Sequence, residues 1–160
     1  MIIVRETEMA DLPCVKALWA DGDVMKFVGF PDGLKQTDEQ MEKWVERISA
    51  SRPQRNHYSV FEDGRYCGES FYSIDADTLS ASVDIKLFAF ARGRGIATKA
   101  LSHAIRQAFE NGAEKVWVDP DPDNIKAIAL YEKLGFVRKP MPDYLAEEDS
   151  TSIYMELCKK

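Results

Sequence analysis

The sequence predicts a single α/β domain over residues 1–160, and three observations lead to this fold class. Short apolar runs alternate with segments of helical periodicity, in the order βααβββαβαββ. The 160 residues suit one domain with a sizeable core, and no linker or internal repeat divides them. Hydrophobic residues at 45% and charged residues at 30% are ordinary for a globular protein.

The N-terminal third is predicted to hold one strand and two helices. Residues 1–7 form an apolar strand, and residues 8–20 carry apolar side chains at helical spacing. Residues 21–34 are predicted to form a loop rich in Gly and Asp. Thr37 and Gln40 then make a capping pattern at the start of a second amphipathic helix.

The middle of the chain is predicted to form three strands, a long helix and a fourth strand. Residues 57–75 contain Asp63-Gly64, a strong hairpin signal, and residues 80–90 form a further strand. The periodic helix after Gly95 stops near Asn111-Gly112. Residues 115–118 form a buried strand, ended by the alternating Asp-Pro run that follows.

The C-terminal part is predicted to add one helix and two strands. Asn124 or Asp123 caps a short helix that ends at Gly135. Residues 136–139 and 152–157 supply the two strands.

The turn at residues 92–95 has the composition of an anion cradle. Gly93 and Gly95 let the main chain turn tightly, and the first N–H groups of the following helix point outward. Arg92 and Arg94 add positive charge beside these donors. A nucleotide-binding P-loop and the dinucleotide fingerprint are both excluded, because Thr98 stands where the fingerprint needs glycine and no glycine precedes Lys99.

A second segment, residues 124–136, completes the pattern. Two sequence motifs of a known protein superfamily are present. One is matched by Arg92, Gly95 and Ala97, and the other by the sequence NIKAIALYEKLGF. With these two elements the chain resembles the GNAT superfamily of acyl-CoA-dependent N-acyltransferases. The segment before AI-LYEKLGF also resembles the aminoglycoside 6'-N-acetyltransferase branch. The clear resemblance covers roughly residues 57 to 140.

The resemblance implies a mixed sheet with helices on both faces. Acyl-CoA would lie where two parallel strands splay apart, the strands that end near Phe90 and Val118. The residues implied in acetyl-CoA binding are Leu87, Phe88, Arg92, Gly93, Arg94, Gly95, Ala97, Thr98, Asn124, Ala127 and Tyr131.

The implied reaction needs a base, an oxyanion donor and an acid. A primary amine is mostly protonated at neutral pH and must lose a proton before it attacks a thioester. Asp84 is the candidate base, with Glu69 or a water chain as alternatives. Main-chain N–H near Leu87 or Phe88 would stabilise the oxyanion. Tyr131 would protonate the departing thiolate, or else pack its helix against the sheet.

Composition limits the partners. The net charge of −6 disfavours nucleic acid and suits cationic acceptors. The two histidines and three cysteines lack metal-ligand spacing, so no metal is expected, and the thiols are interpreted as packing residues. No apolar run long enough to span a membrane and no signal segment is present, which favours a cytoplasmic location. Family members are often homodimers.

The hypothesis is therefore transfer of an acetyl group from acetyl-CoA to a primary amine of a small molecule, by direct attack in a ternary complex. A protein N-terminus or lysine is the alternative acceptor, and a noncatalytic acyl-CoA-binding module is the alternative class. Acceptor choice is expected to depend on the loops at residues 21–36 and 140–151.

Overall fold

The computed structural model describes residues 1–146 and 151–160. Its described strands form one sheet in the order β1-β2-β3-β4-β5-β7-β6, in which only β4 and β5 are parallel neighbours. The strands are β1 (Ile2–Glu6), β2 (Arg55–Glu62), β3 (Arg65–Ile74), β4 (Ser80–Leu87), β5 (Lys115–Val118), β6 (Val137–Arg138) and β7 (Met155–Cys158).

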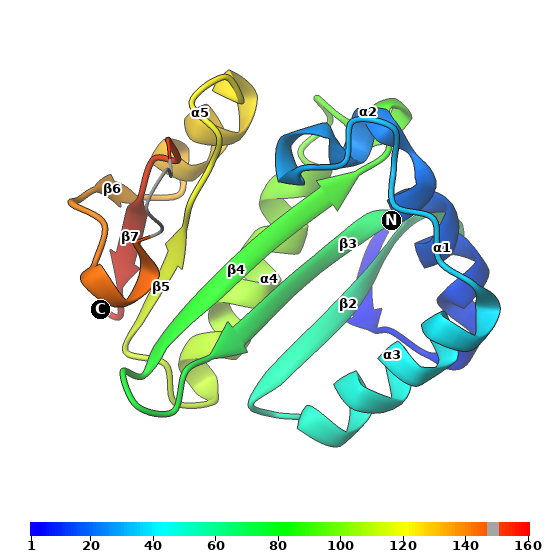
Figure 1. Cartoon of the computed structure of the whole chain (residues 1–160), viewed down its shortest axis with the longest axis horizontal. Helices are drawn as coiled ribbons and strands as arrows, with labels where there is room; N and C mark the ends of the chain where they lie inside the picture. The colour runs from blue at the N-terminus through cyan, green and yellow to red at the C-terminus, as the bar shows by residue number, and fades with distance from the viewer. Residues whose placement is uncertain (147–150) are drawn as a thin grey trace.

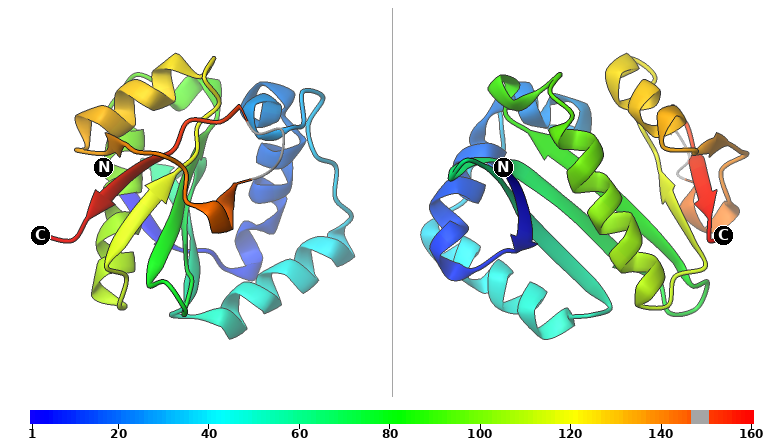
Figure 2. Two further views of the ribbon diagram at one scale, coloured as in Figure 1. Left: turned by 60° about the vertical axis from the view of Figure 1, so that its left-hand side comes forward. Right: turned by 180° about the vertical axis from the view of Figure 1, so that it is seen from behind.

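Helices cover both faces of this sheet, as predicted (Figures 1 and 2). Helix α4 packs on β3, β4 and β5, whereas α1 and α3 pack on β3 and β2 from the other side. The helices are α1 (Leu12–Ala20), α2 (Gly22–Met25), α3 (Asp38–Ser51), α4 (Ile96–Glu110) and α5 (Ile125–Lys133), with 3₁₀ turns η1 (Met9–Asp11), η2 (Lys26–Val28), η3 (Ala89–Ala91) and η4 (Asp143–Leu145).

Local signals in the sequence explain several element boundaries. Thr37 and Gln40 form a complete capping box, in which each side chain bonds the other residue's backbone N–H, at 3.2 and 2.8 Å. Asp63 and Gly64 have φ of 48° and 83°, the left-handed pair that a two-residue hairpin requires. Both predictions are confirmed.

The core is divided between the two faces of the sheet. The largest cluster lies between α4, α5 and strands β3 to β5, and includes Leu101, Ala104 and Val116, all fully buried. A second cluster under α1 and α3 contains Val15 and Leu18. This division leaves one face of β4 uncovered beside α1, which places the functional cleft there.

Three expectations need correction. The strand predicted over residues 80–90 ends at Leu87, because η3 turns the chain away. The loop predicted at residues 21–34 contains α2 and η2, since the Asp21 carboxylate accepts the N–H groups of Asp23 and Val24 and starts a helical turn. Cys158 is exposed and so is not a packing residue.

Candidate functional site

A cleft opens where β4 and β5 separate. These strands pair only between residues 80–82 and 115–117, so in the described chain the rest of β4 is unpaired on that side. The cleft has a volume of about 1050 Å³ and is lined by both strands, the starts of α4 and α5, and the α2–η2 segment. Figure 1 shows the two strands close at one end and far apart at the other. The predicted splaying is confirmed.

The turn before α4 presents backbone N–H groups to this cleft. Gly93 and Gly95 have φ of 74° and 80°, and a Cβ at either position would meet nothing within 4 Å. Glycine is therefore needed here for backbone conformation and not for lack of space. The Lys99 N–H makes the first bond within the helix, to Gly95, so the three preceding N–H groups are free of helical acceptors. With Ala97 and Thr98 also lining the cleft, this helix start suits an anionic group such as a diphosphate.

Both arginines of the turn are engaged with protein groups. The Arg92 guanidinium donates to the Leu87 carbonyl at 3.0 and 3.2 Å and to the Asp23 carboxylate at 2.8 Å. Arg94 pairs with the Glu62 carboxylate and is not among the residues that line the cleft. The arginine pair expected for a diphosphate is thus reduced to Arg92, whose main role in this structure is to join α2 to the end of β4.

The end of β4 turns main-chain groups of Leu87 toward the cleft. The Phe88 N–H donates to the Cys67 carbonyl of β3 at 3.0 Å. Because antiparallel bonding alternates along a strand, the N–H of Leu87 points away from β3. Leu87 lines the cleft, whereas Phe88 packs on Tyr66 and Phe90 outside it. Of the two residues expected to supply a main-chain donor, Leu87 lines the cleft and Phe88 does not.

Helix α5 contributes the wall that faces β4. The Asn124 side chain caps the helix by accepting the N–H of Ala127 at 3.3 Å, and both residues line the cleft together with Tyr131. Tyr131 is 6% exposed, and its hydroxyl makes no hydrogen bond to another described residue. Burial raises the pKa of Tyr131, and the Asp84 and Asp119 carboxylates raise it further, so the phenol stays protonated at neutral pH and can donate.

Asp84 borders the same cleft from the sheet. Its neighbour Val83 packs in the core with α4, so alternation along β4 puts Asp84 and Lys86 on the opposite face. One Asp84 oxygen accepts the N–H of Ile85 at 2.8 Å, and the other contacts the Lys86 ammonium. The Asp84 side chain is 38% exposed and lines the cleft, as does Tyr131. The Asp84 carboxylate and the protonated Tyr131 phenol therefore border the same cavity.

Glu69, the second candidate base, is enclosed. Its carboxylate lies 2.5 Å from His57 Nε2, accepts from Trp19 Nε1 at 3.1 Å and lies 3.7 Å from Lys86 Nζ. Desolvation alone would raise the pKa of Glu69, but the charges of His57 and Lys86 and the bonds from its neighbours outweigh it and lower the pKa to about 2. Glu69 is not among the residues that line the cleft, so it is not placed to take a proton from a ligand there.

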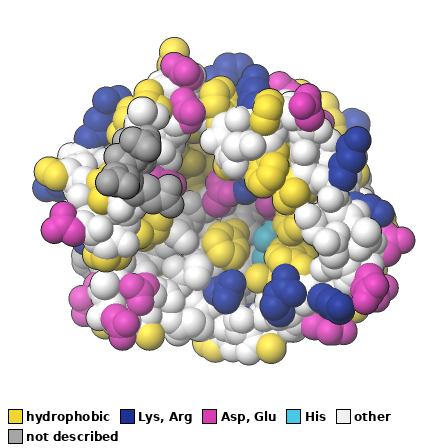
Figure 3. Space-filling view, viewed as in Figure 1, with side chains coloured by type: hydrophobic (Ala, Val, Ile, Leu, Met, Phe, Trp, Pro, Cys, Tyr) yellow, Lys and Arg dark blue, Asp and Glu magenta, His cyan; other side chains and the backbone are white. Residues whose placement is uncertain are grey.

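The loops expected to shape the acceptor side are described only in part. Residues 23, 24 and 26–28 of the first loop line the cleft. In the second loop, at residues 140–151, residues 147–150 lie outside the described residues, while the Tyr144 hydroxyl bonds the Ser80 hydroxyl at 3.1 Å. Figure 3 shows the resulting hollow, with acidic, basic and histidine side chains visible inside it.

Lys86 was missed by sequence reasoning. It follows Asp84 by two positions in a predicted strand, so strand periodicity alone puts both side chains on one face. That signal was available in the sequence, but the contact of Lys86 with Glu69 on β3 depends on the pairing of the two strands.

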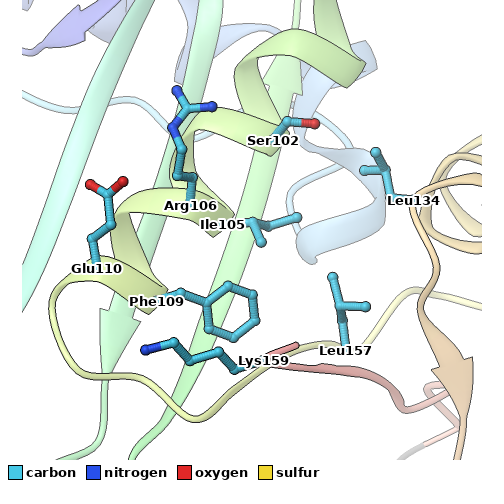
Figure 4. A pocket seen from close by; sticks show the side chains of 8 residues that line it. All are labelled: Ser102, Ile105, Arg106, Phe109, Glu110, Leu134, Leu157 and Lys159. Atoms are coloured by element: carbon cyan, nitrogen blue, oxygen red, sulfur yellow. The ribbon is translucent and has the colours of Figure 1, made fainter.

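Three further findings concern the described residues alone. No group of three metal-ligating side chains occurs among them, and no helix among them could cross a bilayer. A smaller depression of about 350 Å³ lies between α4 and the end of β7, lined by apolar side chains with a charged rim (Figure 4). It contains none of the predicted site residues.

A comparison with family models decides the family. The model of the acetyltransferase (GNAT) domain matches residues 2–137. The chain belongs to the GNAT acetyltransferase family. The GNAT resemblance deduced from the sequence is thereby confirmed.

Two curated relatives are similar to this GNAT domain over short stretches. The N-alpha-acetyltransferase MAK3 of Arabidopsis thaliana is 45% identical over 47 residues, 29% of this chain and 25% of that protein. A kanamycin resistance protein of Rhizobium radiobacter is 33% identical over 64 residues, 39% of this chain and 56% of that protein. The chain thus matches only part of the length of either relative.

Solved GNAT structures share the whole fold. A GNAT acetyltransferase of Streptococcus pneumoniae has a TM-score of 0.81 at 21% identity, with 99% of this chain and 100% of that chain covered. Spermidine N-acetyltransferase of Vibrio cholerae, solved with CoA and spermine, has a TM-score of 0.81 at 18% identity, with 98% and 95% covered. The aminoglycoside acetyltransferase AAC(6')-Ib, solved with coenzyme A, has a TM-score of 0.78 at 20% identity, with 99% and 95% covered.

Proposed function

We propose that this GNAT domain transfers the acetyl group of acetyl-CoA to a primary amine of a small molecule. The observation that carries the proposal is the meeting of three groups in one cleft: the free N–H groups at the start of α4, the carboxylate of Asp84 and the phenol of Tyr131. An anion site, a base and an acid are the parts that acetyl transfer from a thioester requires.

The residues present fit the cosubstrate. The N–H groups of the first turn of α4 would hold the diphosphate, and the Leu87 N–H at the open side of β4 would bond the arm or the thioester carbonyl. Asn124 and Ala127 would border the same ligand from α5.

The reaction balances without a covalent enzyme intermediate. The amine loses a proton to Asp84, directly or through water, and its nitrogen forms a bond to the thioester carbon. The C–S bond then breaks as Tyr131 protonates the departing sulfur, and the second proton that the nitrogen must lose to become an amide restores the Tyr131 phenol, directly or through water. Holding both substrates in one cleft supplies the proximity that direct transfer needs.

Small amines with several cationic centres are the proposed acceptors. Proteins named for kanamycin and spermidine are among those similar to this chain, and both compounds are polyamines. The acidic net charge of −6 favours such acceptors, and a cytoplasmic location is part of the same proposal. A protein N-terminus is the second candidate, favoured by the 45% identity to an N-alpha-acetyltransferase over 47 residues.

A thiol-release screen tests this function. Acetyl-CoA is mixed with kanamycin, spermidine or an alanyl peptide, and released CoA is measured with a thiol reagent. Release with kanamycin or spermidine supports the first candidate, and release with the peptide alone supports the second. Binding of CoA by calorimetry without thiol release from any acceptor would leave a noncatalytic binding module.

Tyr131→Phe checks the proposed acid. We expect kcat to fall by about 10²-fold, because general acid catalysis typically contributes 10²–10⁴-fold, while the Kd of CoA stays within about twofold. Tyr154→Phe is the matched control, since Tyr154 is also buried but bonds Glu156 on β7. Equal kcat for both variants would remove Tyr131 from the mechanism.

A further inference from the structure

A buried charged network lies beside the cleft, on the sheet face that also carries Asp84. Glu69 on β3 is 6% exposed and lies 2.5 Å from His57 Nε2 on β2. Trp19 of α1 donates to the same carboxylate at 3.1 Å. The other ring nitrogen of His57 bonds the Thr7 hydroxyl at 2.7 Å. The Glu69 carboxylate is therefore held by groups from two different elements, β2 and α1.

Lys86 connects this network to the cleft. Its ammonium lies 3.7 Å from the Glu69 carboxylate and contacts the Asp84 carboxylate, and its side chain is 16% exposed. Exposure increases along the row, from 6% at Glu69 through 16% at Lys86 to 38% at Asp84. One cation thus lies between an enclosed anion and an anion that faces the ligand cavity.

The network does not pass protons at neutral pH. The pKa of Glu69 is lowered to about 2, so it remains ionised. Desolvation would lower the pKa of Lys86, but the Asp84 and Glu69 carboxylates outweigh it and raise the pKa, so Lys86 remains charged. A satisfied network of fixed charges is rigid and can therefore orient a charged neighbour.

We propose that Lys86, held in place by Glu69, is a positioning residue that keeps the Asp84 carboxylate directed into the cleft. This inference rests on the proposed role of Asp84 as the base that accepts the amine proton. Glu69 acts one step further away, because it neutralises Lys86 and prevents its ammonium from swinging into the acceptor space.

The other charged groups around Asp84 do not replace Lys86. Tyr131 of α5 and Asp119 beyond β5 line the same cleft, but the first is a neutral phenol and the second an anion. His57 faces Glu69 and Thr7. Among the described residues, Lys86 is the cation that contacts the Asp84 carboxylate.

The experiment compares four variants of the full chain. Lys86→Met removes the charge, and Lys86→Arg keeps it. The double variant Glu69→Gln, Lys86→Met removes both buried charges together, because removing Lys86 alone leaves an uncompensated buried anion. Lys115→Met is the matched control. Lys115 on β5 forms an ion pair with Glu156 on β7 and does not line the cleft. CoA binding by calorimetry confirms that each variant is folded.

We expect Lys86→Met and the double variant to lose about 10–100-fold in kcat/KM with acetyl-CoA and spermidine or kanamycin, because small misplacement of a reacting group has effects of this size. The loss should appear in kcat, while the KM of acetyl-CoA stays within about twofold of the wild type in both variants, because the N–H groups at the start of α4 are untouched. Lys86→Arg should lose less, and Lys115→Met should match the wild type.

Two results would overturn the inference. Wild-type kcat and kcat/KM in the double variant would show that Lys86 serves only to neutralise Glu69. An unchanged Asp84 carboxylate in a crystal structure of Lys86→Met would contradict positioning even if the wild type acetylates none of the probes. If the wild type releases no thiol but the Asp84 carboxylate moves in the structure of Lys86→Met, the proposed function is contradicted and the positioning role of Lys86 is not.

Discussion

Asp84 and Glu69 show how two carboxylates on one sheet face differ in what they can do. They lie on adjacent strands, where Glu69 pairs in register with Lys86, two residues beyond Asp84. Helix α1 covers Glu69 through Trp19. Asp84 lies beyond the last β4 residue that pairs with β5, where the two strands have separated and the cleft opens. The enclosed carboxylate stabilises the fold, and the open one meets the ligand cavity.

Glu69→Gln should change how stability depends on pH. The folded pKa of Glu69 is about 2, below its ordinary value of 4.5, so its contribution is present above about pH 4.5 and is lost as pH falls toward 2. The wild type should therefore lose more free energy of unfolding between pH 5 and pH 3 than the variant does. Urea titrations at several pH values measure this, and parallel curves would contradict it.

The start of α4 shows how packing fixes the position of one end of a helix. Its apolar face packs on the sheet through fully buried residues such as Ala100 and Ala104, which fixes the direction of its N-terminus. The turn before it is left-handed at two glycines and leaves open space above them. Packing of the helix thus sets the direction of its free N–H groups, and the two glycines permit the left-handed turn that precedes them.

Gly95→Ala should weaken both stability and CoA binding. A left-handed residue with a Cβ costs about 1–2 kcal/mol, and relief of that strain would tilt the first N–H groups. Gly112→Ala is the control, because Gly112 has φ of 110° and equally open surroundings at the other end of α4. We expect similar losses of stability, measured by denaturation, but a raised CoA Kd only in Gly95→Ala.

The α2 segment lines the cleft and is joined to the end of β4 through Arg92. Asp23→Ala removes the carboxylate that accepts from Arg92 at 2.8 Å. The KM of the acceptor amine should rise several-fold while the Kd of CoA changes little, because the helix start itself is intact. Asp38→Ala, which breaks a similar exposed pair with Lys16, is the control. A rise in CoA Kd with unchanged acceptor KM would contradict this role.

The whole molecule is acidic, and this affects which ligands it attracts. The net charge of −6 favours approach of cations, whereas acetyl-CoA, the proposed cosubstrate, is an anion and would depend on the local N–H groups of α4. In the proposed function, net charge and local donors would therefore attract different substrates.

The KM of spermidine should rise with ionic strength. Between about 20 and 300 mM NaCl the screening length shortens several-fold, so long-range attraction of a polycation weakens. Steady-state kinetics at both salt concentrations measures the effect. The KM of acetyl-CoA should not rise in parallel, and a spermidine KM independent of salt would exclude steering by net charge.

Local patterns were enough to predict most of the fold. The capping box at Thr37, the hairpin at Asp63 and the amphipathic face of α4 depend on neighbours within a few positions, and all are observed. The boundary of β4 was wrong because η3 depends on a turn that alternating apolar residues conceal. Residues of the site were predictable as members of motifs, while their partners were not.

The sequence by itself determined the order of elements, the family and the glycine turn that opens α4, because these depend on contacts between residues close in the chain. Only the tertiary structure decided that Arg94 and Phe88 face away from the cleft, that Glu69 is enclosed and that Lys86 joins it to Asp84. Those facts depend on pairing between strands and on the divergence of β4 from β5, and such long-range contacts are not encoded in any single segment.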